Sequence, residues 1–174
     1  MIDFATIHYL KNGNPKQKRA YDVLKKYNIF EILDPYSPLL AGTIPIEIDT
    51  ESSDLDIICN VDPASKDVFL NDLIAAQVIP PGTEITVEEV EVRGERCIVL
   101  NFTLEEFPVE IFGQNKPSAE QNAYRHMVAE YSILLEKGEK FKQKIIDLKR
   151  QGMKTEPAFG LLMNLENPYE DLLK

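Results

Sequence analysis

Apolar residues follow two different periods along the chain, and these periods predict its secondary structure. Apolar positions that return every three or four residues predict a helix, whereas short apolar runs, or apolar residues that alternate with polar ones, predict a strand. In chain order we expect a helix over 16–27, an extended segment over 29–33, a strand over 55–61, a helix from 62 to about 76, strands over 84–92, 96–103 and 107–112, helices over 118–136 and 139–151, and short helices over 157–165 and 169–173. This order predicts an α+β fold, with a small mixed β-sheet, flanking helices and a helical C-terminal extension.

Residues typical of helix ends and turns lie at the ends of these elements. Asn14 can cap the first helix, and Pro15 fits its first position. The sequence Ser-Ala-Glu-Gln at 118–121 matches a capping box, and Gly138 can end the helix that follows. Residues 93–95 form a hairpin signal between two strands.

The length of 174 residues predicts a single domain over 1–174. Within it, we expect residues 15–117 to form an α/β core and residues 118–174 to form a helical part packed on that core. The two cysteines, Cys59 and Cys97, lie in apolar runs. Two cysteines are too few for a disulfide framework or a metal cluster, so buried free thiols are expected.

The charge of the chain narrows the choice of partners. It holds 19 Lys and Arg against 29 Asp and Glu, which gives a net charge of −10. An acidic surface repels phosphate backbones and anionic membranes, so neither a long nucleic acid nor a membrane is an expected partner. The sequence shows no secretory signal and no apolar run as long as a membrane span, and a cytoplasmic protein is therefore expected.

Four residues upstream of and within one predicted strand form a candidate site for metal and phosphate. Asp54 and Asp56 are two positions apart at the start of a predicted strand, so their side chains point to the same face. Paired carboxylates suit Mg²⁺, and two-carboxylate sites serve phosphoryl and nucleotidyl transfer. Gly42 and Thr43 lie upstream, where a glycine lets the backbone approach a phosphate and a hydroxyl can donate to it. A solvated strand end is the ordinary alternative for the two aspartates.

These residues together resemble a known superfamily. Leu40-Ala41-Gly42-Thr43, a gap of ten residues, Asp54-Leu55-Asp56-Ile57 and the later Val109-Glu110-Ile111 are similar to the motifs of the nucleotidyltransferases that include DNA polymerase beta. The resemblance covers roughly residues 40–114. Residues 121–127 and 154–159 also resemble a small bacterial branch of that superfamily, which is known as a domain of unknown function.

The resemblance implies a nucleotidyltransferase-like sheet and a division of roles among the residues. Asp54, Asp56 and Glu110 would hold Mg²⁺, as one ion or two, and Glu110 would also help to deprotonate the acceptor hydroxyl. A nucleoside triphosphate would be the donor, with its terminal phosphates on the backbone of Gly42 and Thr43. Further candidates for nucleotide binding are Ser53, Lys116, Arg125 and His126, although a histidine in the middle of a helix more often makes a structural contact or faces water.

One departure from the family pattern is plain in the sequence. Members usually have a short helix, often with a basic residue, directly after the glycine and its hydroxyl neighbour. Here the segment Ile-Pro-Ile-Glu-Ile-Asp at 44–49 has two acids, no Lys or Arg, and a proline that disfavours a helix interior. The charge of the donor phosphates would therefore be met elsewhere in the chain.

Three functions follow from these observations. The first is a Mg²⁺-dependent transfer of a nucleotidyl group to a small-molecule or protein acceptor that the sequence does not identify. The alternatives are a catalytically inactive nucleotide- or protein-binding module on the same fold, favoured by the acidic gap, and a metal-dependent phosphohydrolase. The C-terminal residues 167–174 are compatible with a packing tail or with a contact in a homodimer.

Overall fold

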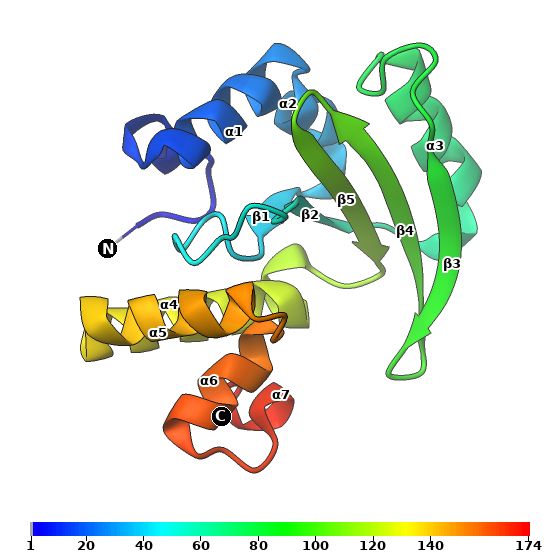
Figure 1. The fold of residues 1–174 in the computed structure, drawn as a ribbon. Coiled ribbons are helices and arrows are strands. Elements are labelled where there is room, and N and C mark those ends of the chain that lie inside the picture. Colours follow the sequence, from blue (N-terminus) through cyan, green and yellow to red (C-terminus); the bar gives the residue numbers. More distant parts are fainter. Residues whose placement is uncertain (1) are drawn as a thin grey trace.

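A mixed β-sheet forms the centre of the computed structural model, which describes residues 2–174 (Figure 1). Its strands are β1 (Leu39–Ala41), β2 (Leu55–Asn60), β3 (Thr86–Val92), β4 (Glu95–Leu104) and β5 (Phe107–Gln114). They lie in the order β1-β2-β5-β4-β3, where β2 and β5 run parallel and every other neighbouring pair is antiparallel. The predicted α+β class with a mixed sheet is thus confirmed.

Two groups of helices surround the sheet. The first comprises α1 (Pro15–Lys26), α2 (Ile29–Leu33) and α3 (Lys66–Ala75), and the second comprises α4 (Asn122–Lys137), α5 (Glu139–Arg150), α6 (Thr155–Met163) and α7 (Pro168–Asp171). Short 3₁₀ segments occupy His8–Asn12, Asp34–Tyr36, Pro63–Ser65 and Ser118–Glu120. In Figure 1 the second group lies at one end of the molecule, with α4 beside α5 and with α6 and α7 beyond them.

The start of α1 agrees with its sequence signal and adds a contact. The Asn14 side chain accepts from the Gln17 backbone N–H at 2.9 Å, and the Gln17 side chain accepts from the Asn14 backbone at 3.0 Å. This reciprocal pair satisfies two N–H groups that a helix start otherwise leaves without partners. The Gln17 side-chain amide also donates to Ile44 O at 2.9 Å, so the cap of α1 is tied to the segment that follows β1.

Residues 29–33 form the helix α2, and the predicted extended segment there is wrong. Ile29 and Leu33 are both fully buried in the core formed with the sheet. Their spacing of four residues places both side chains on one face of a helix, whereas it gives no alternation for a strand. In five residues the two periods are hard to tell apart.

The predicted capping box at 118–121 is also wrong. Ser118–Glu120 forms a 3₁₀ turn, and α4 begins at Asn122 without a side-chain cap. The Ser118 hydroxyl instead donates to Ser37 O at 2.6 Å, which lies 81 residues earlier in the chain. The Ser118 side chain therefore makes a tertiary contact and does not cap the helix.

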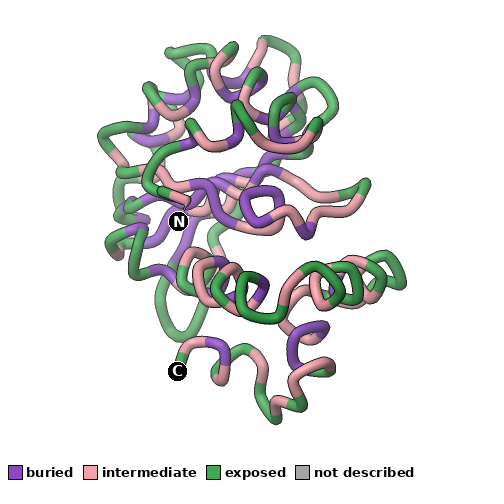
Figure 2. The backbone as a smooth tube through the Cα atoms, turned by 90° about the vertical axis from the view of Figure 1, so that its left-hand side faces the viewer, coloured by how far each residue is buried: buried purple, intermediate pink, exposed green. Residues whose placement is uncertain are grey.

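Buried residues form two hydrophobic clusters (Figure 2). One joins the sheet to α1, α2 and α3, and the other lies among α4–α7. The segment after β1 contributes to both, because Ile44 packs in the first cluster and Ile46 and Ile48 pack in the second. The apolar alternation at 44–48 therefore reflects a turn between two cores, and the segment is not helical, as its proline predicts. The division at residues 117 and 118 stays a prediction.

Two smaller expectations are settled by burial and hydropathy. Cys59 and Cys97 are free and fully buried, as predicted. Within residues 2–174, none of the helices combines the length and the apolar character that crossing a bilayer requires.

Candidate active site

Three carboxylates meet where β2 and β5 run side by side. Asp56 on β2 is the register partner of Glu110 on β5, and Asp54 directly precedes β2. Burial, followed by the charges of Asp54 and Glu110, raises the pKa of Asp56 to about 8. Burial, followed by Asp54, also raises the pKa of Glu110. The structure thus brings together three acids that are unfavourable to one another when all are ionised.

Gly42 lies directly against this cluster. Its φ of +77° is in the left-handed region, and a Cβ at this position would lie 2.0 Å from Oδ2 of Asp56. Any larger residue would collide with the carboxylate, so both the backbone conformation and the available space require glycine. The turn after β1 therefore presents bare backbone beside Asp56.

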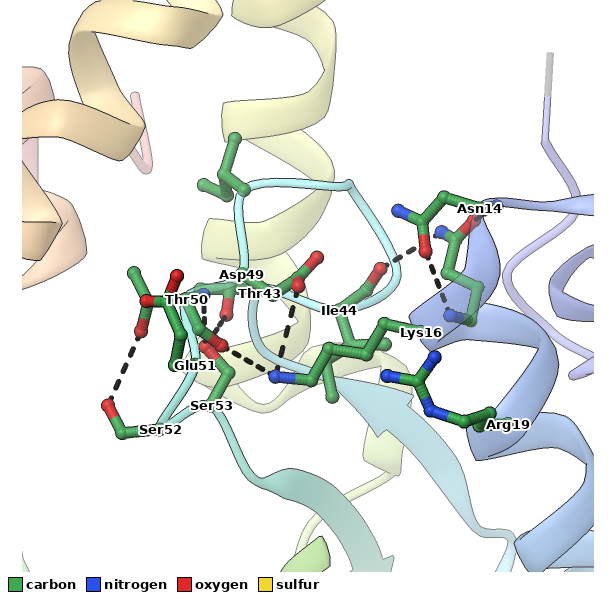
Figure 3. A network of polar contacts seen from close by, with 12 residues as sticks. Asn14, Lys16, Arg19, Thr43, Ile44, Asp49, Thr50, Glu51, Ser52 and Ser53 are labelled. Atoms are coloured by element: carbon green, nitrogen blue, oxygen red, sulfur yellow. Dashed lines mark hydrogen bonds and ion pairs between the residues drawn. The ribbon is translucent and has the colours of Figure 1, made fainter. Parts of the chain in front are cut away.

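A dense polar network holds the loop between this glycine and Asp54 (Figure 3). The Thr43 and Ser53 hydroxyls lie 3.1 Å apart, and Ser53 also accepts from the Thr50 backbone N–H at 2.9 Å. From α1, the Lys16 ammonium donates to Thr50 O at 2.5 Å and lies 3.9 Å from the Asp49 carboxylate. Ser53 thus connects the two ends of the loop.

The loop has no Lys or Arg of its own, and two further cations reach it from α5. Lys142 pairs with Glu47 at 2.6 Å, and the Lys149 ammonium donates to Ile48 O at 2.7 Å. Lys149 is partly buried, and burial lowers its pKa to about 8 against the opposing charges of Glu130, Asp49 and Asp56. A helix about 100 residues later in the chain therefore places positive charge near the carboxylates.

A cavity of about 410 Å³ opens between the carboxylates and the second group of helices. One wall contains Gly42, Thr43, Asp56 and Glu110, and the opposite wall belongs to α4 and α6. The volume lies within the range of ordinary small-molecule pockets. Of the other candidate residues, Lys116 and His126 line the cavity, whereas Asp54, Ser53 and Arg125 are outside its lining.

The contacts of these candidates differ in kind. His126 is buried, with Nε2 2.9 Å from Tyr169 O and Nδ1 3.7 Å from the Glu156 carboxylate. Because a carbonyl only accepts, Nε2 carries the proton. Lys116 pairs with Glu95 at 3.3 Å. The Arg125 guanidinium instead faces the C-terminus and donates to Leu173 O at 3.4 Å.

Three residues of the cavity's helical wall were not identified from the sequence: Gln121, Glu130 and Glu156. A signal for Glu130 does exist in the sequence. Met127 and Leu134 are buried positions of α4, and Glu130 lies between them at helical spacing, so it interrupts an apolar face with a carboxylate. Gln121 and Glu156 lie in the segments 121–127 and 154–159 that resemble the bacterial branch, but the sequence assigned them no role at the site.

The donor set fits Mg²⁺, although the side chains do not form a finished metal site. In residues 2–174, no three His, Cys, Asp or Glu side chains are grouped as metal ligands. The three carboxylates supply the oxygen ligands that this ion prefers, and the cation would relieve the repulsion that raises the pKa of Asp56.

The fold is similar to that of solved nucleotidyltransferases. The chain matches a cytoplasmic RNA terminal U-transferase (TM-score 0.52, 16% identity, 78% of this chain and 39% of that one) and the Cid1 poly(U) polymerase with Mg 3′-dATP bound (0.53, 16%, 78% and 41%). It also matches GLD-2 in its complex with RNP-8 (0.52, 15%, 89% and 60%). At such identities the likeness shows the fold alone, and the chain spans only about two to three fifths of these neighbours.

Sequence comparison places the chain in a family. No curated protein matches it. One family model does match, over residues 22–174, and its description is "Domain of unknown function (DUF4269)". The narrower resemblance to DNA polymerase beta stays a prediction. The match spans most of the chain, including the carboxylates, the glycine turn and all the helices of the second group, and the chain therefore belongs to the DUF4269 family.

Proposed function

We propose that this protein transfers a nucleotidyl group from a nucleoside triphosphate to a hydroxyl group of a small-molecule or protein acceptor. The observation that carries the proposal is the pairing of Asp56 with Glu110 beside the bare backbone of Gly42, at the wall of a cavity of about 410 Å³. Carboxylates beside a glycine turn combine oxygen ligands for a divalent cation with backbone N–H groups for phosphate. The nucleotidyltransferase fold supports the same assignment.

In this proposal the three acids divide the work. Asp54, Asp56 and Glu110 would hold Mg²⁺, which supplies charge stabilisation and orients the phosphates when bound. Glu110 takes the proton of the acceptor hydroxyl, in keeping with a pKa raised by burial and by Asp54. The acceptor oxygen then forms a bond to the α-phosphorus, the bond from that phosphorus to its bridging oxygen breaks, and pyrophosphate leaves with the electron pair.

The phosphates are bound by the turn after β1 and by a cation from α5. Backbone N–H groups of Gly42 and Thr43 donate to the terminal phosphates, and Ser53 keeps the Thr43 hydroxyl in place at 3.1 Å. Lys149 supplies positive charge close to Asp56. Lys116 lines the same cavity and contacts the rest of the nucleotide. His126 lies on the helical wall and contacts Tyr169 O, and Arg125 has no role in this proposal because it faces Leu173.

A nucleotide-binding module without chemistry is the second candidate. The observation that favours it is that no three potential ligands in residues 2–174 are grouped as a metal site. A module of this kind would bind nucleotide on the glycine turn without requiring Mg²⁺. A phosphohydrolase with water as acceptor would use the same carboxylates and would release free phosphate or a monophosphate.

A thermal-unfolding panel tests the proposal first. The four common nucleoside triphosphates are added with and without Mg²⁺ to the wild type and to the Asp54→Asn/Asp56→Asn variant. The matched control is Asp22→Asn/Asp67→Asn, which makes the same change at two exposed positions of α1 and α3. A ligand at about 100 times its Kd stabilises the native state by about 2.7 kcal/mol, so a specific complex gives a clear shift.

Each outcome favours one candidate. A Mg²⁺-dependent shift in the wild type and in the control, but not in the Asp54→Asn/Asp56→Asn variant, supports the transferase. A shift that does not require Mg²⁺ and occurs in all three proteins supports the binding module. The phosphohydrolase would release a monophosphate or phosphate in the absence of any acceptor. If none of the triphosphates shifts the unfolding temperature, the proposal is contradicted.

A further inference from the structure

The lining of the cavity holds more acidic than basic side chains. Its lining contains the carboxylates of Asp56, Glu95, Glu110, Glu130 and Glu156 and the cations of Arg93 and Lys116. Arg93 is paired at 2.6 Å with Glu170 of α7, and Lys116 is paired with Glu95. Within residues 2–174, the other four carboxylates of the lining have no Lys or Arg at ion-pair distance.

Two of these four belong to the proposed Mg²⁺ site, and the other two lie on the helical wall. Burial raises the pKa of Glu130 on α4, and the nearby carboxylate of Glu156 on α6 raises it further as the smaller effect. Glu130 is 4% exposed, and within the described part of the chain its Oε1 has no hydrogen-bond partner. A buried polar atom without a partner costs free energy, so it is rare in native proteins unless a ligand completes it.

The neighbouring cation does not complete Glu130. Lys149 is near enough to lower the pKa of Glu130, but its recorded hydrogen bond goes to Ile48 O. His126, one turn before Glu130, directs Nε2 to Tyr169 O, and its Nδ1 lies 3.7 Å from Glu156. Within the described residues, Oε1 of Glu130 is thus a buried acceptor without a donor, on a residue that lines the cavity.

A second buried acceptor lines the same cavity without a partner. Oε1 of Gln121 has none among the described residues, and Gln121 is only 1% exposed. Its amide nitrogen donates to Cys59 O at 2.9 Å and to Lys116 O at 3.1 Å, which fixes Oε1 as the free acceptor. Gln121 is the N-cap of α4, and Glu130 lies within the same helix. An occupant that reaches both acceptors carries more than one hydrogen-bond donor.

We propose that the helical wall of this cavity is the acceptor subsite, and that the acceptor is a small hydroxyl-bearing amine whose protonated amino group is held by Glu130 and Glu156. Further N–H or O–H groups of the same molecule donate to Oε1 of Gln121. An amino sugar has this chemistry, because it carries both protonated amines and hydroxyl donors. The inference rests on the proposed function, because the hydroxyl that reacts must reach the carboxylate pair on the opposite wall.

Binding of three disaccharides with one common backbone tests the subsite without Mg²⁺ or nucleotide. Fully deacetylated chitobiose carries protonated amines, cellobiose carries hydroxyls at the same positions, and N,N′-diacetylchitobiose carries neutral amides there. Titration calorimetry compares them on the wild type and on Glu130→Gln, which keeps the shape of the side chain and removes its charge. Glu136→Gln is the matched control, because Glu136 is an exposed residue of the same helix.

The expected result is that the wild type and Glu136→Gln bind the diamine at least tenfold more tightly than cellobiose or the diacetyl compound. Glu130→Gln should lose this preference, and Glu156→Gln should lose part of it. Equal binding of the three disaccharides, absence of diamine binding to the wild type, or an unchanged preference in a folded Glu130→Gln protein would overturn the subsite. Adenosine, tested in parallel, separates an acceptor amine from a nucleobase amine, and loss of adenosine binding alone in Glu130→Gln would contradict the proposal.

Failure of this inference and failure of the proposed function give different results. A Mg²⁺-dependent triphosphate shift without diamine binding would leave the transferase and remove the amine subsite. Diamine binding without any triphosphate shift would leave a ligand site on the helical wall and remove the transferase.

Discussion

The loop between Gly42 and Asp54 and the cavity side of α4 differ in whether their polar groups have hydrogen-bond partners. In the loop, the side chains of Thr43 and Ser53 bond to each other, and carbonyls of the loop accept from Gln17, Lys16 and Lys149. At the N-cap of α4 and within that helix, the buried Oε1 atoms of Gln121 and Glu130 are without partners among the described residues. Native proteins satisfy almost all their buried polar groups. The loop meets this rule with its own contacts, whereas the cavity side of α4 would meet it only when a ligand is bound.

The charges of the two regions follow the same division. Acids of the loop are balanced from α1 and α5, because Glu47 pairs with Lys142 and Asp49 lies near Lys16. Across the cavity, Glu130 and Glu156 have no Lys or Arg at ion-pair distance in the described part of the chain. Removing a side chain that bonds to the loop should therefore destabilise the protein. Removing a carboxylate of the helical wall should stabilise the protein and abolish ligand binding there.

The largest effect is expected for Asp56→Asn. We expect turnover to fall by on the order of 1,000-fold or more, because the variant loses a charged oxygen at the centre of the proposed Mg²⁺ site. Asn also removes a carboxylate whose pKa burial raises to about 8, so the free energy of unfolding at pH 9 should equal or exceed that of the wild type. Steady-state assays and urea unfolding measure both, and turnover retained within tenfold would contradict the role of Asp56.

The next effect concerns the pH dependence of stability through Glu130. Burial and Glu156 raise its pKa in the folded protein from 4.5 to about 8, while Lys149 opposes the shift. Between these two pH values the folded state keeps a proton that the unfolded state loses. The stabilising contribution is complete below pH 4.5 and is lost as pH rises toward 8.

Glu130→Gln should remove this dependence. The variant should be more stable than the wild type at pH 9 by a few kcal/mol, at most about 5 kcal/mol, and nearly equal to it at pH 4.5. Urea unfolding at the two pH values measures the difference, with Glu136→Gln as the exposed control on the same helix. A wild type and a Glu130→Gln variant with parallel pH profiles would show that Glu130 is ionised in the folded protein.

A smaller loss of stability is expected for Gln17→Ala. The side chain of Gln17 is 2% exposed, completes the cap of α1, and donates to Ile44 O and to Pro45 O at 2.9 and 3.3 Å. Its removal ends the cap of α1 and leaves the Pro45 carbonyl without a donor, while Ile44 O keeps only the Glu47 N–H, and it should cost about 2–3 kcal/mol in unfolding free energy. Gln143→Ala, an exposed position of α5, is the matched control, and equal stability of the two variants would contradict the role of Gln17 in fixing the loop.

The sequence is a good guide to those parts of the site that are local. The glycine turn and the Asp-x-Asp strand start are encoded within a few residues, and the four longer strands follow from patterns of six or more residues. The parallel pairing that brings Glu110 to Asp56 depends on a crossover of about 50 residues, which single-sequence patterns do not encode. The same reason explains the failure at Ser118, whose partner is Ser37, and the missed contributions of Lys149 and Glu130, whose neighbours lie on other helices.

The smallest effects separate two cations that approach the loop from different helices. Lys16 and its partner Asp49 have side chains that are 17% and 16% exposed, and Lys16 also donates to Thr50 O. Arg150 and its partner Glu51 are 51% and 80% exposed, at 3.4 Å.

Lys16→Met should therefore cost about 1 kcal/mol, because a charged hydrogen bond shielded from water is lost, whereas Arg150→Met should change the unfolding free energy by less than about 0.5 kcal/mol. Salt is the control, because 1 M NaCl screens exposed pairs and should leave most of the Lys16 effect in place. Equal losses for the two variants would mean that the loop depends on its total positive surroundings and not on the specific contact of Lys16 with Thr50.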